Sequence, residues 1–307
     1  MNPGLKQKIY QAQCIGNVEP IEYMIPYPSM RSLIEGQNIK FAEQVIFKNP
    51  ELTNLKFYEL IQQTAHWLDS LGFKPKERII LSELEFPQTE ILLFGIWHLG
   101  AIAVIPAMVD LNEVKEKSQT SNVIPPETNL FNTIKDFPTK FDPKYKPLLD
   151  DEALVTFEKR NGIRLSHYNL LVNTNSIQKA IGLKSRTHFA CDLSPNSSAW
   201  VVLKAILPIY CGCVFDEENP EFTIGELNST FNYRKDLQNH NQFQETYLAI
   251  CPQNGAVLSV GQAPLHLTEI HHHENEIEIH GHSLMMGYLD DALNESCFRG
   301  GGFFLDI

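Results

Sequence analysis

The chain carries little positive charge. Its 307 residues include 25 Lys and Arg against 37 Asp and Glu, which gives a formal net charge of −12. A surface of this sign repels polyphosphates, and the sequence contains no basic run interleaved with aromatic residues. Nucleic acid and anionic membrane are therefore poor candidates as partners.

The sequence also lacks the cysteine spacing of a zinc ribbon and the cysteine density of a secreted disulfide scaffold. Reduced thiols in a cytosolic protein are the expectation for such a set. The N-terminal residues MNPGLKQKIYQAQ have no apolar run behind their positive charges, so nothing there resembles a secretory signal. We expect a cytoplasmic protein. The six cysteines are Cys14, Cys191, Cys211, Cys213, Cys251 and Cys297.

Only one stretch, Ile91 to Val109, is apolar over the length of a membrane span. Gly95, His98, Gly100 and Pro106 interrupt it, and it divides naturally at Gly100. We therefore predict a buried helix in its first half. The second half, Ala101 to Ile105, has the β-branched character of a buried parallel strand.

Helical and strand patterns are present on both sides of this stretch. Apolar residues from Lys56 to Gly72 are spaced for one helix face, and Gly72 supplies a C-terminal stop. Arg78 to Ser82 reads as a strand and about Pro87 to Leu99 as a helix. Together with the strand that ends at Pro106, they form a β-α-β unit, which is typical of a parallel sheet.

The remainder of the chain predicts three parts: a first α/β subdomain at 1–150, a second at 151–246 and a small β-rich subdomain at 247–307. A Lys- and Pro-rich connector occupies about 112–146. In the second part we predict a strand at Ala153 to Phe157, a helix from an N-cap at Ser166 to Gly182, and another helix at Ala199 to Leu207. In the third part, alternation in Leu265 to Ile270 and Glu276 to His280 predicts a β-hairpin.

Histidines gather on this hairpin. Strand alternation places His271 with His273, and His280 with His282, on common faces. With Glu274 or Glu276, two histidines from each strand supply the ligand types of a zinc or nickel site. A solvent-facing polar side of the hairpin explains the same residues, and we assign no metal ligand.

Three stretches, in collinear order, resemble the adenylate-forming (AMP-binding) acyl-CoA and aryl-CoA synthetases. The first is LKFYELIQQTAHWLDSLGFKPKERIILSELEFPQTEILLFGIWHLGAIAVIPA, from Leu55 to Ala107. The second, GIRLSHYNLLVN, is similar to the segment after the family's phosphate-binding loop. The third comprises SVGQAPLHLTEI and NEIEIHGHSLMMGYLDD, in which Gly281, Met285, Gly287 and Tyr288 resemble the family's G-x-x-x-M-x-G-Y run.

This resemblance implies an α/β fold: the large N-terminal body of an adenylate-forming synthetase, with mostly parallel sheets flanked by helices and a small C-terminal β-barrel-like part. It implies ATP or AMP with Mg²⁺ as cofactors, and a small carboxylic acid or an acyl or aryl adenylate as ligand. The nucleotide would contact Thr156, Arg160, Tyr288 and Asp306.

The sequence departs from the family where the chemistry is done. The Ser/Thr/Gly-rich phosphate loop is replaced by TFEKRNGIRLSH, in which Thr156, Lys159, Arg160 and Gly162 offer partial substitutes. Lys159 and Arg160 either meet a phosphate or form a solvated turn. The adenine-binding aromatic-Gly-x-Thr-Glu motif has no counterpart between Phe215 and Val260, and no residue corresponds to the catalytic lysine.

Asp306 stands where the family has the Asp of a ribose-binding Thr-Gly-Asp, without the Thr-Gly. We therefore expect a pseudoenzyme with weak or lost adenylation that binds a carboxylate or adenylate, or that serves as the partner of another enzyme. The alternative is an active AMP-forming ligase of reduced size, completed by a C-terminal domain on another polypeptide.

Overall fold

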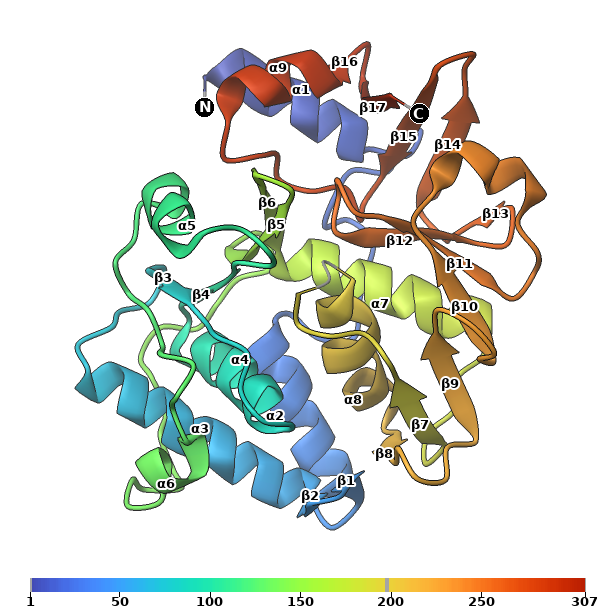
Figure 1. Cartoon of the computed structure of the whole chain (residues 1–307). Helices are drawn as coiled ribbons and strands as arrows, with labels where there is room; N and C mark the ends of the chain where they lie inside the picture. Colours follow the sequence, from blue (N-terminus) through green and yellow to red (C-terminus); the bar gives the residue numbers. More distant parts are fainter. Residues whose placement is uncertain (1, 197–198, 307) are drawn as a thin grey trace.

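Three sheets organise the computed structural model, which describes residues 2–196 and 199–306 (Figure 1). The first has the order β3-β4-β5-β6, with β3 (Arg78–Ile80), β4 (Ile102–Ile105) and β5 (Glu152–Glu158) parallel and β6 (Asn161–Ser166) antiparallel to β5. The predicted β-α-β unit is confirmed. Helix α4 (Gln88–Leu99) connects β3 to β4 and packs against α3 (Asn54–Ser70) and α2 (Met30–Phe41).

The second sheet has nine strands in the order β13-β12-β11-β10-β9-β7-β8-β1-β2. Every neighbouring pair from β11 to β1 is parallel. The pairs β11–β12 and β12–β13 at one edge, and β1–β2 at the other, are antiparallel. The sheet is therefore mixed. Its strands are β1 (Val45–Lys48), β2 (Glu51–Thr53), β7 (His188–Cys191), β8 (Val214–Phe215), β9 (Phe222–Gly225), β10 (Phe231–Arg234), β11 (Tyr247–Cys251), β12 (Ala256–Val260) and β13 (Ala263–Pro264).

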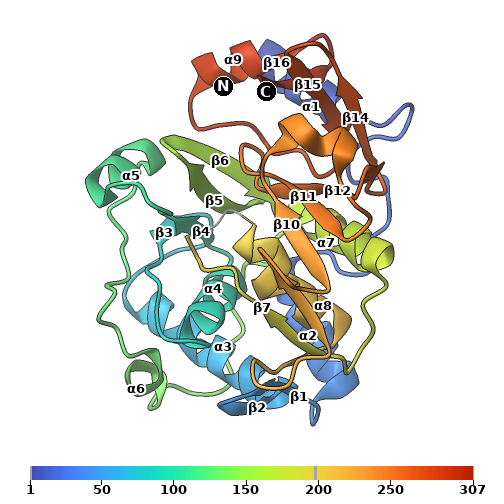
Figure 2. The ribbon, with the colours of Figure 1, turned by 45° about the vertical axis from the view of Figure 1, so that its right-hand side comes forward.

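Helices cover this sheet, and their ends follow local sequence signals. Helix α7 (His167–Ile181) packs against β12, begins after a capping box at Ser166 and ends at Gly182 in the left-handed conformation (Figure 2). Both ends agree with the prediction. The helix predicted at Ala199 to Leu207 is present as a π-helix, η1 (Val201–Ile206), followed by α8 (Leu207–Cys211).

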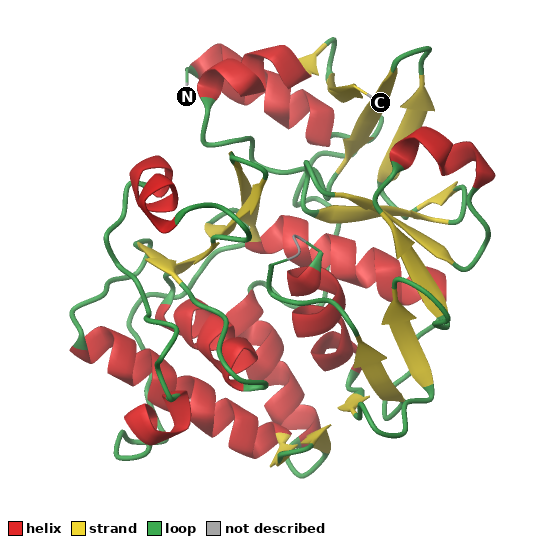
Figure 3. Ribbon diagram, viewed as in Figure 1, coloured by secondary structure: helices red, strands yellow, loops and turns green. Residues whose placement is uncertain are grey.

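The C-terminal part is rich in strands (Figure 3). The predicted hairpin is present as β14 (Thr268–His272) and β15 (Glu276–Gly281), and it continues through β17 (Gly302–Asp306) to β16 (Phe298–Arg299). Helices α1 (Pro3–Gln13) and α9 (Asp291–Cys297) pack against this antiparallel sheet. The four strands form a row with β14 and β16 at its edges, and a barrel-like closure of this part stays a prediction.

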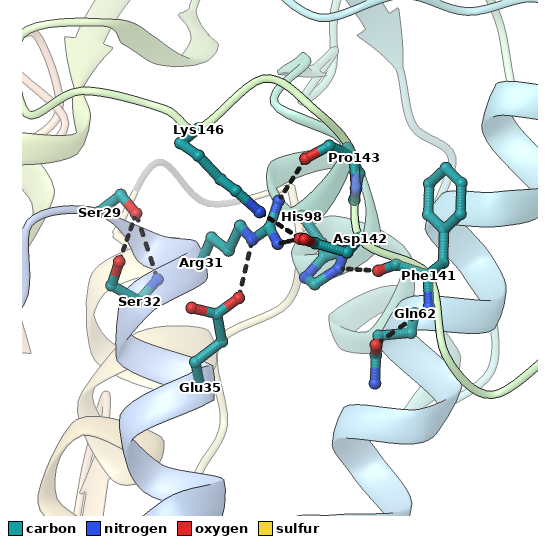
Figure 4. A network of polar contacts seen from close by, with 10 residues as sticks. All are labelled: Ser29, Arg31, Ser32, Glu35, Gln62, His98, Phe141, Asp142, Pro143 and Lys146. Atoms are coloured by element: carbon teal, nitrogen blue, oxygen red, sulfur yellow. Dashed lines mark hydrogen bonds and ion pairs between the residues drawn. The ribbon is translucent and has the colours of Figure 1, made fainter.

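The predicted connector contains two short helices, α5 (Leu111–Ser118) and α6 (Leu130–Ile134). Buried polar groups tie its later residues to the helices below (Figure 4). The Arg31 guanidinium binds Glu35 at 2.8 Å and also Asp142, while a ring nitrogen of His98 lies 2.8 Å from the Phe141 carbonyl oxygen. The segment is therefore fixed in place even though its sequence shows little periodicity.

A large hydrophobic core joins the sheets, and a second, smaller cluster includes Ile80, Val104 and Phe157. A continuous cluster of buried apolar side chains includes Trp97 of α4, Trp200 before η1 and Phe303 of β17. Ile91 to Val109 forms the buried α4 and β4, as predicted, and none of the described helices is long and apolar enough to cross a membrane. All six cysteines are free thiols. The division of the chain at 150 and 246 stays a prediction.

Candidate functional site

The β5–β6 hairpin closes with a turn of two residues. Glu158 pairs with Asn161, so only Lys159 and Arg160 lie between the strands, and Lys159 has a φ of 54°. Arg160 makes a two-point ion pair with Glu113 of α5, with Nε–Oε1 and Nη2–Oε2 distances of 2.7 Å. Arg160 and then Lys117 hold the pKa of Glu113 down at about 2. The hairpin tip therefore has no loop, and the charge of its arginine is already paired.

Thr156 lies inside the fold. Its side chain is buried, and its Oγ1 has no hydrogen-bond partner among the described residues. Its methyl group lies next to Gly255, because a Cβ atom placed on that glycine would be 3.5 Å from Thr156 Cγ2. Thr156 therefore packs beneath the turn that follows β11.

Tyr288 supports the same turn from another side. Its hydroxyl donates a hydrogen bond of 2.9 Å to the Gln253 carbonyl oxygen, and burial raises the pKa of Tyr288. Asn254 accepts from the Met285 backbone N–H at 2.8 Å. The turn at 252–255 is thus fixed to the chain segment at 285–288.

Asp306, at the end of β17, opens onto a cavity of about 320 Å³. This cavity lies where the parallel strands β10 and β11 end, because Lys235 follows β10 directly and Gln253 lies just after β11. Ligands in open α/β sheets bind at the carboxyl ends of the strands. The lining residues are Lys235, Asp236, Leu237, Gln238, Gln253, Leu305 and Asp306.

The structure thus brings some of the sequence-predicted residues together and separates another. Asp306 lines the cavity, Tyr288 supports its Gln253 wall, and Thr156 packs under the adjoining turn. Arg160 instead lines a second cavity of about 470 Å³ beside Met108 and Glu113.

Sequence reasoning missed Lys235, Asp236, Gln238 and Gln253, which line the cavity beside Asp306. The available signal was their position: a polar cluster follows each of the runs FNYR and YLAIC. The first of these runs lies in a polar, Asn- and Gln-rich region in which no strand was predicted.

The hairpin histidines make ion pairs and hydrogen bonds with carboxylates. Glu278 binds His273 at 3.0 Å and His280 at 2.9 Å. The prediction that His282 shares a face with His280 is wrong, because β15 ends at Gly281 and His282 is buried, with its Nδ1 2.6 Å from the Tyr168 hydroxyl. Within residues 2–196 and 199–306, no group of three or more His, Cys, Asp or Glu side chains is arranged to hold a metal ion.

No protein-family model and no curated protein matches the sequence. Solved structures do match the fold. The N-terminal domain of FACL13 from Mycobacterium tuberculosis is 13% identical with a TM-score of 0.73, and the match covers 90% of this chain and 95% of that one. The N-terminal subdomain of NpsA from Klebsiella oxytoca, solved with 3-hydroxyanthranilyl-AMSN, is 14% identical with a TM-score of 0.71, covering 91% and 95%.

The anthranilate CoA ligase AuaEII, solved in complex with anthranoyl-AMP, is 14% identical with a TM-score of 0.70, covering 92% of this chain and 74% of that one. The chain therefore has the fold of the N-terminal domains of adenylate-forming acyl- and aryl-CoA ligases, as the resemblance implied. At these identities the likeness establishes the fold alone.

Proposed function

We propose that this chain binds an adenylate, either AMP or an acyl or aryl adenylate, in the cavity beside Asp306, and that its ability to make one from ATP is weak or lost. One observation carries the proposed loss of adenylation: only Lys159 and Arg160 lie between the paired strands, in the stretch that the sequence resemblance aligns with the family's phosphate loop.

Adenylation needs donors aimed at the charge that develops on the transferring phosphate. Removing one such preorganised donor costs about 10²–10³ in rate. The hairpin tip offers no row of free backbone N–H groups comparable to a phosphate loop, because β5 and β6 stay paired up to the turn. Arg160 would have to leave Glu113 before it could meet a phosphate. ATP with Mg²⁺ therefore has a poor site for its β- and γ-phosphates.

The cavity beside Asp306 suits a smaller ligand. An ionised carboxylate accepts two hydrogen bonds and so fits the paired hydroxyls of a ribose. Lys235 supplies a cation for a single phosphate group, and Gln238 and Gln253 are side-chain amides in the same lining. The volume of about 320 Å³ is at the lower end of the range for ligand sites. The complex of AuaEII with anthranoyl-AMP supports this ligand class.

Calorimetric titration with AMP tests the proposal. We expect the unaltered chain to bind AMP and Asp306→Asn to bind it about tenfold more weakly, because the substitution removes charge-assisted hydrogen bonds to the ribose. Glu274→Gln, an exposed carboxylate in the hairpin turn, is the matched control and should bind like the unaltered chain. Equal AMP affinity in all three proteins would show that Asp306 does not hydrogen-bond the ribose hydroxyls.

A second candidate is an active AMP-forming ligase of reduced size, completed by a domain in trans. The observation that favours it is the cavity that Asp306 lines, whose Gln253 wall is held by the Tyr288 hydroxyl. Pyrophosphate release from ATP and Mg²⁺ with a panel of carboxylic acids distinguishes the two. We expect none above background, whereas acid-dependent release would make the chain an enzyme.

The cellular setting also remains a proposal. Six free thiols support a reducing compartment, and we place the protein in the cytoplasm. An adenylate bound without being made must be supplied or consumed by another enzyme, so we propose a protein partner as well.

A further inference from the structure

A short helix joins the cavity to the C-terminal sheet. The 3₁₀ helix η2 (Leu237–Gln242), coloured orange in Figure 1, begins with residues that line the cavity and ends near β14. On one face of the sheet, the register places His272, Ile277 and Leu305 in one row, and Leu305 also lines the cavity. One side of the cavity is thus built from η2 and the end of this row.

His240 of η2 and His272 of β14 are joined by a hydrogen bond. His240 Nδ1 and His272 Nε2 lie 3.0 Å apart, the ring centres 5.2 Å apart, and the ring planes differ by 16°. The two rings therefore meet edge to edge, with the facing nitrogens between the ring centres. This is the geometry of an N–H···N hydrogen bond that lies close to both ring planes.

The hydroxyl of Ser259 determines which ring nitrogen of neutral His240 carries the proton. Ser259 donates its only O–H to the Gly261 carbonyl oxygen at 2.8 Å, so at its 2.8 Å contact with His240 Nε2 the serine oxygen is the acceptor. His240 Nε2 therefore carries a proton. In neutral His240 the Nδ1 lone pair then accepts from His272 Nε2–H.

This order also excludes a nucleophilic role for Ser259. A Ser-His-His arrangement needs the serine to donate to the imidazole, and Ser259 is fully buried with its proton on Gly261.

Few other charges face this pair. On the opposite face of the hairpin, Glu278 is occupied by His273 and His280. On η2 itself, Asp236 accepts from the Gln238 backbone and from the Asn239 side chain. Burial, and then His272, lower the pKa of His240. His240 is therefore neutral near pH 7 and takes up its proton below the usual histidine range.

We propose that the His240–His272 hydrogen bond is a proton-operated latch that holds η2, and with it one wall of the cavity, against the C-terminal sheet. The first proton that the pair takes up keeps the bond, because an imidazolium N–H donates to the neutral imidazole facing it. A second proton places N–H donors on both facing nitrogens, and the bond is lost, so the latch opens when both rings are protonated. This regulation rests on the adenylate site proposed above.

The latch is tested first without any ligand. Long-range ¹H–¹⁵N correlation should show neutral His240 with its proton on Nε2 at pH 7.5. Amide exchange of residues 235–242, corrected for the intrinsic effect of pH, should rise about three- to tenfold between pH 7.5 and 4.5, as expected for the loss of one hydrogen bond. A proton on His240 Nδ1 at neutral pH, or protection that does not change with pH, would overturn the latch.

Substitution at the exposed partner separates the latch from general acid effects. His272→Phe removes the donor, so residues 235–242 should exchange as fast at pH 7.5 as those of the unaltered chain at pH 4.5, with little further change on acidification. His271→Phe alters the neighbouring histidine on the opposite face and should keep the pH response of the unaltered chain. Identical behaviour of the two variants would contradict the proposal.

AMP affinity at two pH values then tests whether the latch controls the proposed adenylate site. If AMP binds, the fall in its affinity between pH 7.5 and 4.5 should be about three- to tenfold larger in the unaltered chain than in His272→Phe, because the AMP phosphate takes up its own proton near pH 6 equally in both. If AMP binds at neither pH, the proposed function fails, while the exchange and tautomer results still decide the latch. An equal fall of AMP affinity in both proteins, in a chain whose exchange does respond, would show that η2 does not gate the site.

Discussion

Buried ionisable side chains are the most unusual single residues in this fold. Glu90, in the first turn of α4, is 2% exposed, and its Oε2 has no hydrogen-bond partner in the part of the chain that the structure describes. Burial raises the pKa of Glu90 to about 7, and the Lys204 cation offsets only part of this effect. Glu90 therefore keeps its proton in the folded chain at pH values where an exposed glutamate has lost it.

Glu90 should make stability fall as pH rises. Its pKa is higher in the folded chain than in the unfolded chain, so its contribution is full below about pH 4.5 and is lost as pH rises through about 7. Relative to Glu90→Gln, the unaltered chain should lose about 3 kcal/mol of unfolding free energy between pH 4.5 and 8. Urea unfolding of both proteins at several pH values measures this difference, and Glu85→Gln, an exposed neighbour, should show none.

At the residue scale, the sequence predicts candidate site residues only where they resemble a motif. Tyr288 and Asp306 were predicted this way, and Asp306 lines the cavity while Tyr288 lies behind its Gln253 wall; their role in binding stays a prediction. Lys235 and Gln253 belong to no motif, and their position at adjacent strand ends depends on the pairing of β10 with β11. Such a long-range pairing is not visible in local periodicity.

Elements with local end signals could be predicted well. Helix α7 follows from Ser166 and Gly182 because capping and left-handed C-terminal turns are short-range. Strand β6 was missed, because the comparison with the phosphate loop made residues 156–167 read as a shortened loop. Its pairing with β5 becomes evident only once Lys159–Arg160 is recognised as a complete hairpin turn.

The α7 cap provides a test of one element. Ser166 Oγ accepts from the Asn169 backbone N–H at 3.0 Å, and the Asn169 side chain accepts from the Ser166 N–H at 3.0 Å. Ser166→Ala should lower the unfolding free energy by about 1 kcal/mol, and Ser166→Thr should restore most of it. Chemical denaturation measures both values. Ser70→Ala, at the exposed end of α3, is the comparison, and a loss equal to that of Ser166→Ala would argue against the cap.

On the scale of the whole molecule, parallel pairing joins parts that are distant in sequence. Phe47 of β1 pairs with Phe215 of β8, which places the start of the first predicted part in the sheet of the second. The sequence predicted parallel sheets from the β-α-β pattern, but strand order depends on contacts between residues more than a hundred positions apart. The antiparallel edges of the large sheet were unpredicted for the same reason.

A shared core predicts a single unfolding transition. Trp97 donates to the Ala153 carbonyl oxygen in the first sheet at 2.8 Å, while Trp200 is buried beside the second sheet, and both belong to one apolar cluster. Trp67 and Trp97 both lie in the part at 1–150, so the fluorescence of Trp200→Phe reports on that part, and its thermal midpoint should equal the midpoint from circular dichroism of the same variant. Two separate midpoints would instead support independent folding of the part at 1–150.

The turn at Lys159–Arg160 limits the evolutionary routes open to this chain. No point substitution can restore a phosphate loop, because the backbone that would form it is missing between two fully paired strands. Under the proposed loss of adenylation, its recovery requires an insertion, and an exposed hairpin tip is where insertions disturb a fold least. The hairpin tip is therefore a suitable place to graft a phosphate-binding loop. The protein without the graft is the control for the activity of the grafted variant.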